Sequence, residues 1–302
     1  MNLGLTISQL NLYGLTIAFA ILMGTLLCIR EEKHRNLPKD LGIDIILFAV
    51  PLAVIFSRIY YVIFAWNQFR FEPIRALYIW EGGLAIYGGV IGGVLGLWLL
   101  SKRRKIPMLT LTDVAVPSLL LGQAIGRWGN FFNREAHGQL VSNASLRFFP
   151  VAVQINDSWF YATFFYESMW NLLGFVFLYA NRRKMRETHP RGDLTLWYFA
   201  WYGLGRMTIE MLRTDSLMLG SMRISQGLSI LLFAVAMVLL SMRRKIGHQV
   251  YFLLAIGLLT TIYAATQENL ALLLAGVIMN AVYAAIVYAS YRRTKYHAPT
   301  NL

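Results

Sequence analysis

Long apolar runs recur along the whole chain and constrain its fold more than any other feature. They occupy residues 12–29, 43–64, 84–100, 109–125, 159–180, 194–212, 224–242, 250–265 and 270–289. A helix needs ~20 apolar residues to cross the hydrocarbon core of a bilayer, where backbone groups find no water and must be satisfied internally. The chain has 302 residues, of which 57% are apolar and only 14% charged. The sequence therefore predicts an all-α, polytopic membrane helical bundle of about nine spans, the eighth being short.

Most of the basic residues of the chain cluster in the connections between these runs. The net charge is +13, and 19 of the 28 Lys and Arg residues fall in five clusters, at residues 30–39, 102–105, 182–191, 243–245 and 292–295. Every second connection carries one cluster, as the positive-inside rule predicts for cytoplasmic loops. We therefore expect the N-terminus outside, the C-terminus in the cytoplasm, and no nucleic-acid partner.

Lysine and arginine are distributed differently. All seven lysines lie in the five clusters, whereas the nine basic residues elsewhere are all arginine: Arg58, Arg70, Arg75, Arg127, Arg134, Arg147, Arg206, Arg213 and Arg223. The planar guanidinium binds phosphate oxygens bidentately and stays charged. This predicts an outward-facing site for an anionic headgroup. For Arg70, Arg75 and Arg223, snorkelling or nonspecific contact with interfacial lipid is the alternative.

The chain is expected to divide near residue 242. Residues 1–242 would form a membrane core, and residues 243–302 would add a two-helix hairpin and a basic cytoplasmic tail. The hairpin's polar cluster Gln267, Glu268 and Asn269 suits a tight external turn. The single cysteine, Cys28, excludes intrachain disulfides and multi-cysteine metal sites, and we expect it to pack as a small apolar residue.

The outer connection at residues 127–159 is the longest. Loops of this length usually carry a function. We expect it to form a small extracytoplasmic head between spans four and five, built from strands or from short helices.

The segment GRWGNFFNREAHG, at residues 126–138, places polar groups directly after the fourth apolar run. They are Arg127, Asn130, Asn133, Arg134 and Glu135. Ionisable residues near membrane depth are costly and by default indicate a functional site. Gly126 and Gly129 lack side chains, which lets a ligand or another backbone come close. The segment is our first candidate for headgroup binding.

The sixth run supplies a second polar group. Tyr202, Arg206, Glu210 and Arg213 are spaced i, i+4, i+8 and i+11, which puts them on one face of a helix. This face is expected to meet the same ligand. A purely structural Arg206–Glu210 pair is the alternative.

A glycine-rich stretch, EGGLAIYGGVIGGVLG, covers residues 81–96. Gly88, Gly92 and Gly96 recur every fourth residue, which lets two helices approach closely. Gly82 and Gly83 precede that helix, and their backbone N–H groups would be free to meet an anion. Tyr87 would lie near the membrane surface, either in the site or as an interfacial belt residue.

These segments resemble the bacterial prolipoprotein diacylglyceryl transferases. The resemblance rests on GRWGNFFNREAHG, supported by WEGGLAIYGG at 80–89, FYES at 165–168 and YGLGRMTIE at 202–210, and covers about residues 8–242 in order. It implies a seven-helix core in the bacterial plasma membrane. It also implies transfer of an sn-1,2-diacylglyceryl group from phosphatidylglycerol to the lipobox cysteine of prolipoprotein signal peptides, with release of glycerol phosphate. The partners would be that lipid, those peptides and membrane lipid, with no cofactor or metal.

The resemblance also implies residue roles. Arg127 and Arg206 would clamp the phosphate as catalytic residues, with Tyr87 and Glu135 also in the catalytic set. The substrate-binding set would comprise Arg127, Asn130, Asn133, Gly126, Gly129, Tyr13, Tyr202, Glu210, Gly82 and Gly83. Within it, Asn130 and Asn133, together with Glu135, would orient the headgroup or Arg127, and Glu210 would hold Arg206 in place.

Tyr87 departs from the family pattern, because many members have histidine there. Histidine acts as a base near neutral pH more readily than tyrosine does. Either nearby arginines activate the phenol, or Glu135 or His137 accepts the proton, or no general base is needed.

A phospholipid transporter that uses the same arginines is the alternative function. Transporters often contain two related halves. We find no second GRxGN-like segment, which favours the transferase.

Overall fold

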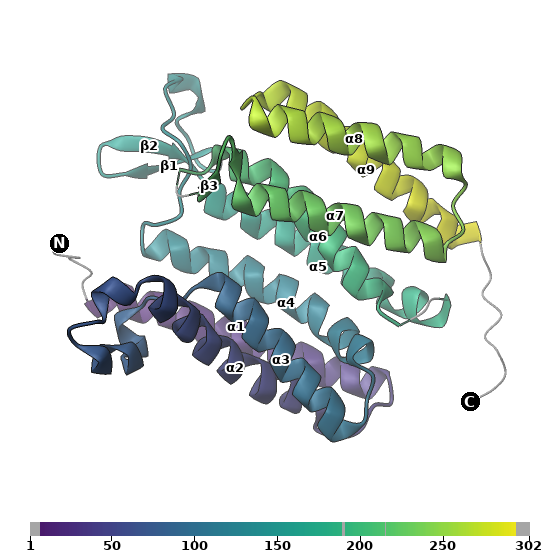
Figure 1. Ribbon diagram of the computed structural model, residues 1–302, viewed down its shortest axis with the longest axis horizontal. Coiled ribbons are helices and arrows are strands. Elements are labelled where there is room, and N and C mark those ends of the chain that lie inside the picture. The colour runs from purple at the N-terminus through teal and green to yellow at the C-terminus, as the bar shows by residue number, and fades with distance from the viewer. Residues whose placement is uncertain (1–6, 189–190, 215, 294–302) are drawn as a thin grey trace. The chain divides into compact units, whose positions relative to one another are not determined.

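Helices dominate the structure, a computed structural model that describes residues 7–188, 191–214 and 216–293 (Figure 1). Within these ranges the nine α-helices are α1 (Ile7–His34), α2 (Leu41–Phe64), α3 (Ile86–Arg104), α4 (Met108–Phe132), α5 (Thr163–Thr188), α6 (Asp193–Ile209), α7 (Ile224–Arg243), α8 (His248–Thr266) and α9 (Leu270–Arg293). Each contains one of the nine apolar runs or most of it. The predicted all-α membrane bundle is confirmed.

Six of these helices, α1, α2, α4, α7, α8 and α9, are long and apolar enough to cross a membrane. The protein is therefore a multi-pass membrane protein. In the described part of the chain, α3, α5 and α6 fall short of the same measure. Helix α6 has only 17 residues, and α3 ends in Lys102, Arg103 and Arg104. Helices α5 and α6 also contain charged residues within their apolar runs, Glu167 on α5 and Arg206 on α6.

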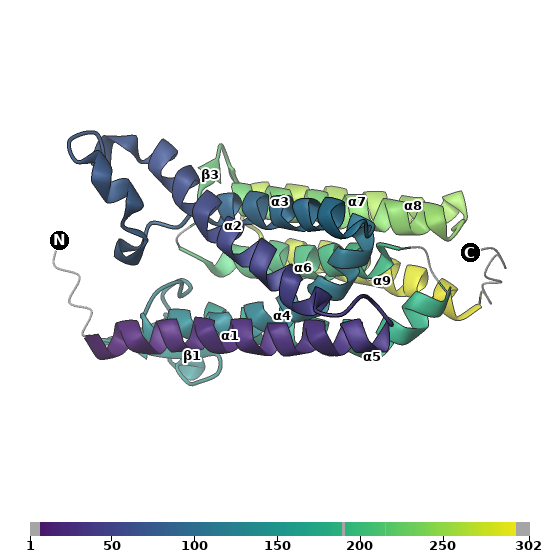
Figure 2. The ribbon, with the colours of Figure 1, turned by 90° about the horizontal axis from the view of Figure 1, so that it is seen from below.

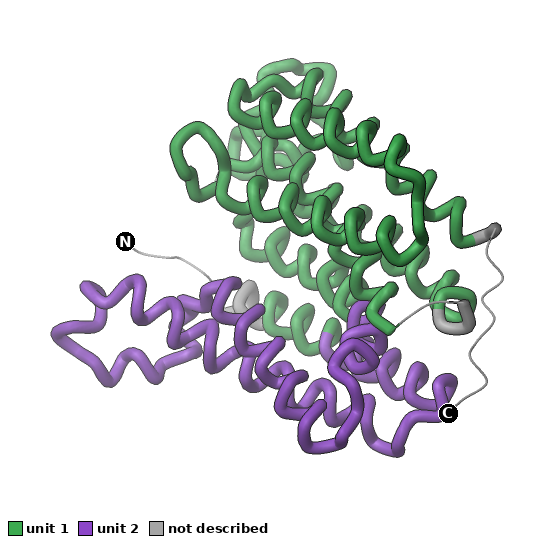
Figure 3. The backbone as a smooth tube through the Cα atoms, turned by 45° about the vertical axis from the view of Figure 1, so that its right-hand side comes forward, with its two compact units in different colours: residues 1–20, 119–302 green, residues 21–118 purple. Residues whose placement is uncertain are grey.

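The chain forms two compact units, residues 21–118 and residues 1–20 with 119–302 (Figure 3). The boundaries fall within α1 and α4, so each unit contains part of both helices. In the unit of residues 21–118, Cys28 is buried in an apolar cluster with Leu41, Ile45 and Leu100. The prediction that Cys28 packs as a small apolar residue is confirmed.

Helices α2 and α3 approach each other through glycines. A Cβ atom added to Gly92 would overlap the carbonyl oxygen of Leu52, and Gly88 and Gly96 face the carbonyl oxygens of Phe56 and Phe48 in the same way. All three glycines are buried. The prediction that this spacing permits close helix packing is confirmed.

The segment between α2 and α3 contains three short 3₁₀ helices, η1 (Trp66–Gln68), η2 (Pro73–Leu77) and η3 (Ile79–Glu81). The buried Arg58 holds it in place, because its guanidinium donates to the carbonyl oxygens of Arg75, Ala76 and Gly82 at 2.7, 2.9 and 2.6 Å. Arg75 pairs with Glu81 at 3.1 Å. Arg58 and Arg75 therefore stabilise this connection.

In the other unit, the connection after α4 forms the expected small head. It contains the 3₁₀ helix η4 (Ala144–Leu146) and an antiparallel hairpin of β1 (Ala152–Ile155) and β2 (Ser158–Tyr161), with Val153 opposite Phe160. A 3₁₀ turn, η5 (Glu210–Leu212), follows α6, and β3 (Met218–Leu219) pairs with β4 (Met222–Arg223) before α7. The sequence did not decide whether the head consists of strands or of short helices, and the structure contains both.

The C-terminal hairpin of α8 and α9 runs alongside α7 (Figures 1 and 2). At one end, Tyr291 of α9 donates to Asp193 at 2.9 Å. At the other end, Glu268 in the turn pairs with the buried Arg223 at 3.2 Å, so Arg223 holds the hairpin. Polar contacts at both ends thus fix α9 to the rest of this unit.

Candidate functional site

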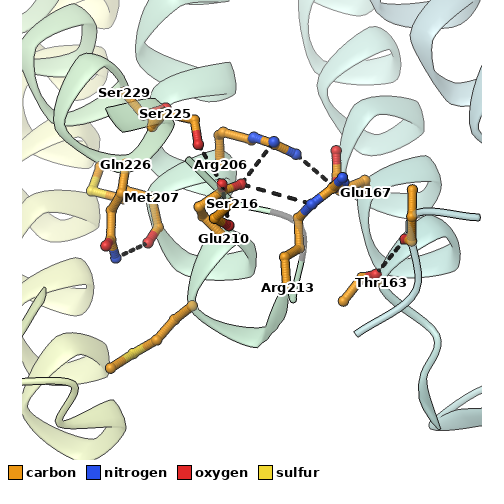
Figure 4. Close-up of polar contacts among 12 residues, drawn as sticks. Thr163, Glu167, Arg206, Met207, Glu210, Arg213, Ser216, Ser225, Gln226 and Ser229 are labelled. Atoms are coloured by element: carbon orange, nitrogen blue, oxygen red, sulfur yellow. Dashed lines mark hydrogen bonds and ion pairs between the residues drawn. The ribbon is translucent and has the colours of Figure 1, made fainter. Parts of the chain in front are cut away.

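The buried carboxylate of Glu167, on α5, joins three arginines. Its Oε1 accepts hydrogen bonds from Nη1 of Arg206 at 2.8 Å and from Nη1 of Arg213 at 2.9 Å (Figure 4). Its Oε2 forms an ion pair with Arg127 of α4. Charges from α4, α5 and α6, together with Arg213 just beyond η5, therefore meet at one side chain.

A second buried carboxylate, Glu210, binds two of the same arginines. Its Oε2 lies 2.7 Å from Nη2 of Arg206 and 4.0 Å from Nε of Arg213. Its Oε1 accepts hydrogen bonds from the hydroxyls of Ser216, at 2.7 Å, and Ser225 (Figure 4). The expected role of Glu210 in holding Arg206 is supported by this contact.

The end of α6 determines where Arg213 lies. Arg206 and Glu210 are one helical turn apart, so their side chains meet. The tighter turn η5 then ends the helix, and Arg213 adopts extended backbone with φ −86° and ψ 151°. Its backbone pairs with Gly138, where a side chain would clash with the Cβ of Tyr161 at 2.7 Å. The last glycine of the 126–138 segment thus docks onto the chain that follows α6.

The cluster, defined here as Arg127, Glu167, Arg206, Glu210 and Arg213, has three cations and two anions and so a formal charge of +1. The side chains of Arg127 and Arg206 are 20% and 14% exposed, against 5% for Glu167 and 1% for Glu210. A small cavity beside the cluster is lined by Tyr202, Arg206 and Glu167, among others. The surplus charge and the more accessible guanidiniums suit a ligand with one negative charge.

The polar residues after Arg127 form a separate contact group. The side-chain amides of Asn130 and Asn133 donate to Oε1 of Glu135 at 3.1 and 3.4 Å. Arg127 has its ion pair with Glu167 instead. Glu135 therefore orients the two asparagines in this structure, whereas Glu167 orients Arg127.

Gly126 and Gly129 face α1. A Cβ atom on Gly129 would lie 2.8 Å from the ring of Tyr13, and one on Gly126 would lie 3.7 Å from Ile17. The absent side chain of Gly129 thus accommodates Tyr13, which brings that predicted residue close to the 126–138 segment. Tyr202 stacks on Tyr198 with ring centroids 5.9 Å apart.

The remaining predicted residues, Gly82, Gly83 and Tyr87, belong to the unit of residues 21–118. The expectation of a free N–H at Gly82 is wrong, because this group donates to the carbonyl of Ile79 at 3.3 Å. Positive φ at Gly82 and Gly83 serves the turn that Arg58 binds. The ring centroid of Tyr87 lies 6.1 Å from that of Tyr60.

The predicted site set omitted four residues of this arrangement: Glu167, Arg213, Ser216 and Ser225. Two of them carried a sequence signal, since Glu167 lies in FYES and Arg213 ends the polar stripe of the sixth run. The serines carried none, because Ser216 lies in the connection after η5 and Ser225 at the start of α7, and only the fold brings both hydroxyls to Glu210.

Comparisons with known proteins place the chain in a family. Residues 2–242 match the family model described as prolipoprotein diacylglyceryl transferase. A phosphatidylglycerol--prolipoprotein diacylglyceryl transferase from Halalkalibacterium halodurans is 45% identical over 242 residues, which cover 78% of this chain and 83% of the relative. Proteins of the same name from Bacillus cereus and Bacillus anthracis are 44% identical and are covered over 88% of their length, with 78% of this chain covered.

The relatives are transferases, and nothing in their names supports the phospholipid-transporter alternative. Four residues of the cationic cluster lie in the segments that carry the resemblance: Arg127, Glu167, Arg206 and Glu210. This chain is an enzyme that belongs to the prolipoprotein diacylglyceryl transferase family.

Proposed function

We propose that this protein transfers the sn-1,2-diacylglyceryl group of phosphatidylglycerol to the lipobox cysteine of prolipoprotein signal peptides. The cysteine sulfur forms a C–S bond with the glyceryl carbon, the C–O bond to phosphate breaks, and glycerol phosphate leaves. The thiol proton passes to an acceptor. Family membership supports this reaction, since relatives carry both substrates in their names.

The single observation that carries the proposal is the +1 cluster around Glu167. The phosphodiester of phosphatidylglycerol has one negative charge, and a second develops as the C–O bond breaks. Guanidiniums held in advance by fixed carboxylates stabilise such charge without reorganising during the reaction. Arg127 and Arg206, the two more exposed cations, would contact the phosphate, with Tyr202 beside them.

Other predicted residues complete the proposed site. Asn130 and Asn133 would bind the glycerol part of the headgroup, with Glu135 fixing their orientation. Tyr87 stays a proposed site residue, and Glu135 is the candidate proton acceptor closest in sequence to Arg127.

The proposed setting is the bacterial plasma membrane, with the N-terminus outside and the C-terminus in the cytoplasm. The cluster would then lie near the outer face. Residues 1–242 would carry out the reaction, and residues 243–302 would supply the hairpin and tail.

Mass spectrometry tests the proposal directly. Purified protein is incubated with phosphatidylglycerol micelles and a lipobox peptide, and the peptide is examined for a diacylglyceryl adduct. Loss of one preorganised donor typically costs about 10²–10³ in rate, so Arg127→Ala should remove nearly all product. Arg206→Lys should also be slow, because lysine lacks the guanidinium's two-pronged geometry.

Arg70→Ala is the matched control, since it removes one exposed outer arginine that contacts the ring of Phe71. It should react like wild type. Intact bound lipid without adduct from folded wild-type protein would favour the transporter. Full turnover by Arg206→Lys would refute the bidentate clamp.

A further inference from the structure

An apolar groove of about 420 Å³ lies between α5, α6 and α9. Its walls include Trp170 and Leu173 of α5, Ile209 of α6, and Leu270 and Leu274 of α9. This volume lies within the range of about 300–1,000 Å³ that is usual for ligand pockets.

The polar groups in the groove wall are already satisfied. The hydroxyl of Thr208 donates to the carbonyl of Leu204 at 2.9 Å, and that of Tyr166 donates to the carbonyl of Val151. A ligand in the groove would therefore meet hydrocarbon and aromatic surfaces. Such a surface suits an alkyl chain rather than a peptide backbone, whose polar groups would need partners.

Two residues of the groove wall also lie beside the cationic cluster. Trp170 and Ile209 line both the groove and the small cavity that Glu167 and Arg206 also line. The groove thus offers an apolar surface whose wall residues Trp170 and Ile209 also lie beside Glu167 and Arg206 of the cationic cluster. An amphiphile with an anionic group at the head of an alkyl chain matches this arrangement, because its charge would face the cluster while its chain lies in the groove.

The α9 wall is fixed and lies outside the family match. Leu270 and Leu274 are one helical turn apart and each is 43% exposed. Asn280 donates to Thr261 of α8 at 3.1 Å, and the contacts of Tyr291 and Glu268 hold both ends of the hairpin. The family match ends at residue 242, so Leu270 and Leu274 lie in a part of this chain that the family model does not cover.

We propose that the groove binds an acyl chain of the phosphatidylglycerol donor, and that the C-terminal hairpin thereby sets the enzyme's selectivity for acyl-chain length. This inference rests on the proposed function, because it names the donor lipid as the occupant. It gives residues 243–302 a role in substrate recognition that the core alone would not provide.

A groove-filling substitution tests the inference in the full-length enzyme. Transfer is measured with phosphatidylglycerols of short and long acyl chains, for wild type and Leu274→Trp. The indole should exclude part of a long chain, so KM for long-chain donors should rise about tenfold, the loss expected for about two excluded methylene groups. The kcat value and the KM for short-chain donors should stay near wild type.

Val282→Trp is the matched control, because Val282 is also exposed on α9, at 48%, and does not line the groove. It should leave the chain-length profile unchanged. The same profile for wild type and Leu274→Trp would overturn the inference, as would an equal shift in both tryptophan variants.

A second measurement needs no substitution. Phosphatidylglycerol with a diazirine in its acyl chain is photolysed with wild-type protein, and the labelled peptides are identified by mass spectrometry. Labelling of residues 166–173 and 270–274 in excess over a matched zwitterionic lipid is expected. Equal labelling by both lipids would show bulk lipid in the groove and overturn the inference. An inactive wild-type enzyme would instead refute the proposed function itself.

Discussion

Glu167 shows how one residue can determine the arrangement of several charges. Its two oxygens contact Arg127, Arg206 and Arg213, and its side chain is only 5% exposed. Three guanidiniums this close would repel one another without an anion among them. Glu167 is therefore a positioning residue that holds the two proposed phosphate-binding arginines.

Replacement of Glu167 by glutamine should destabilise the protein. The amide keeps the shape but removes the negative charge, and breaking a buried ion pair typically costs about 3–5 kcal/mol. We expect a lower Tm for thermal unfolding in detergent micelles, together with slower transfer.

Glu81→Gln is the control for this comparison. Its pair with Arg75 is exposed, so its loss should cost below about 1 kcal/mol. If Glu167→Gln and Glu81→Gln had equal Tm values, Glu167 would not organise the arginines.

At the scale of elements, the packing of α2 against α3 depends on the glycines of α3 that face α2, and not on every glycine of that helix. Gly92→Ala would push a methyl group into the backbone of Leu52, whereas Gly93, the next residue, has no atom within 4 Å of an added Cβ. Overpacking typically costs about 1–3 kcal/mol. Where an added methyl group meets no neighbouring atom, a Gly→Ala change within a helix is instead slightly favourable.

Thermal unfolding of the two variants checks this prediction. Gly92→Ala should lower Tm, and Gly93→Ala should leave it unchanged or raise it. Because both substitutions add the same methyl group to adjacent residues, a similar fall in both would contradict the close approach of α2 and α3.

The end of α6 illustrates what helical periodicity can predict at this scale. The i, i+4 spacing correctly predicted that Arg206 and Glu210 meet. It did not predict the turn η5, nor the backbone pairing of Arg213 with Gly138, which involves a segment far away in the sequence.

At the scale of the whole molecule, the positive-inside pattern predicts which connections face the cytoplasm. Replacement of Cys28 by alanine gives a cysteine-free background, since the chain has one cysteine. Single cysteines are then placed at exposed positions, Lys39 in a basic connection and Ala144 in the head.

A membrane-impermeant thiol reagent applied to intact cells should label Ala144→Cys and leave Lys39→Cys unlabelled. Permeabilised cells supply the control, in which both should react. The reverse labelling would invert the proposed topology and place the cationic cluster toward the cytoplasm.

The sequence by itself determined the features that depend on local composition and spacing. Apolar runs long enough to span a bilayer predicted the helices, and glycine spacing predicted the α2–α3 contact. The motif residues Arg127 and Arg206 were singled out because charge is costly near a membrane.

Only the tertiary structure decided which charges are paired. Glu167 meets arginines at positions 127, 206 and 213, and no sequence spacing relates these positions to it. The same holds for the groove, whose wall at Leu270 and Leu274 packs beside α5 residues about a hundred positions earlier. Such contacts arise from helix packing, which brings together residues that periodicity treats as independent.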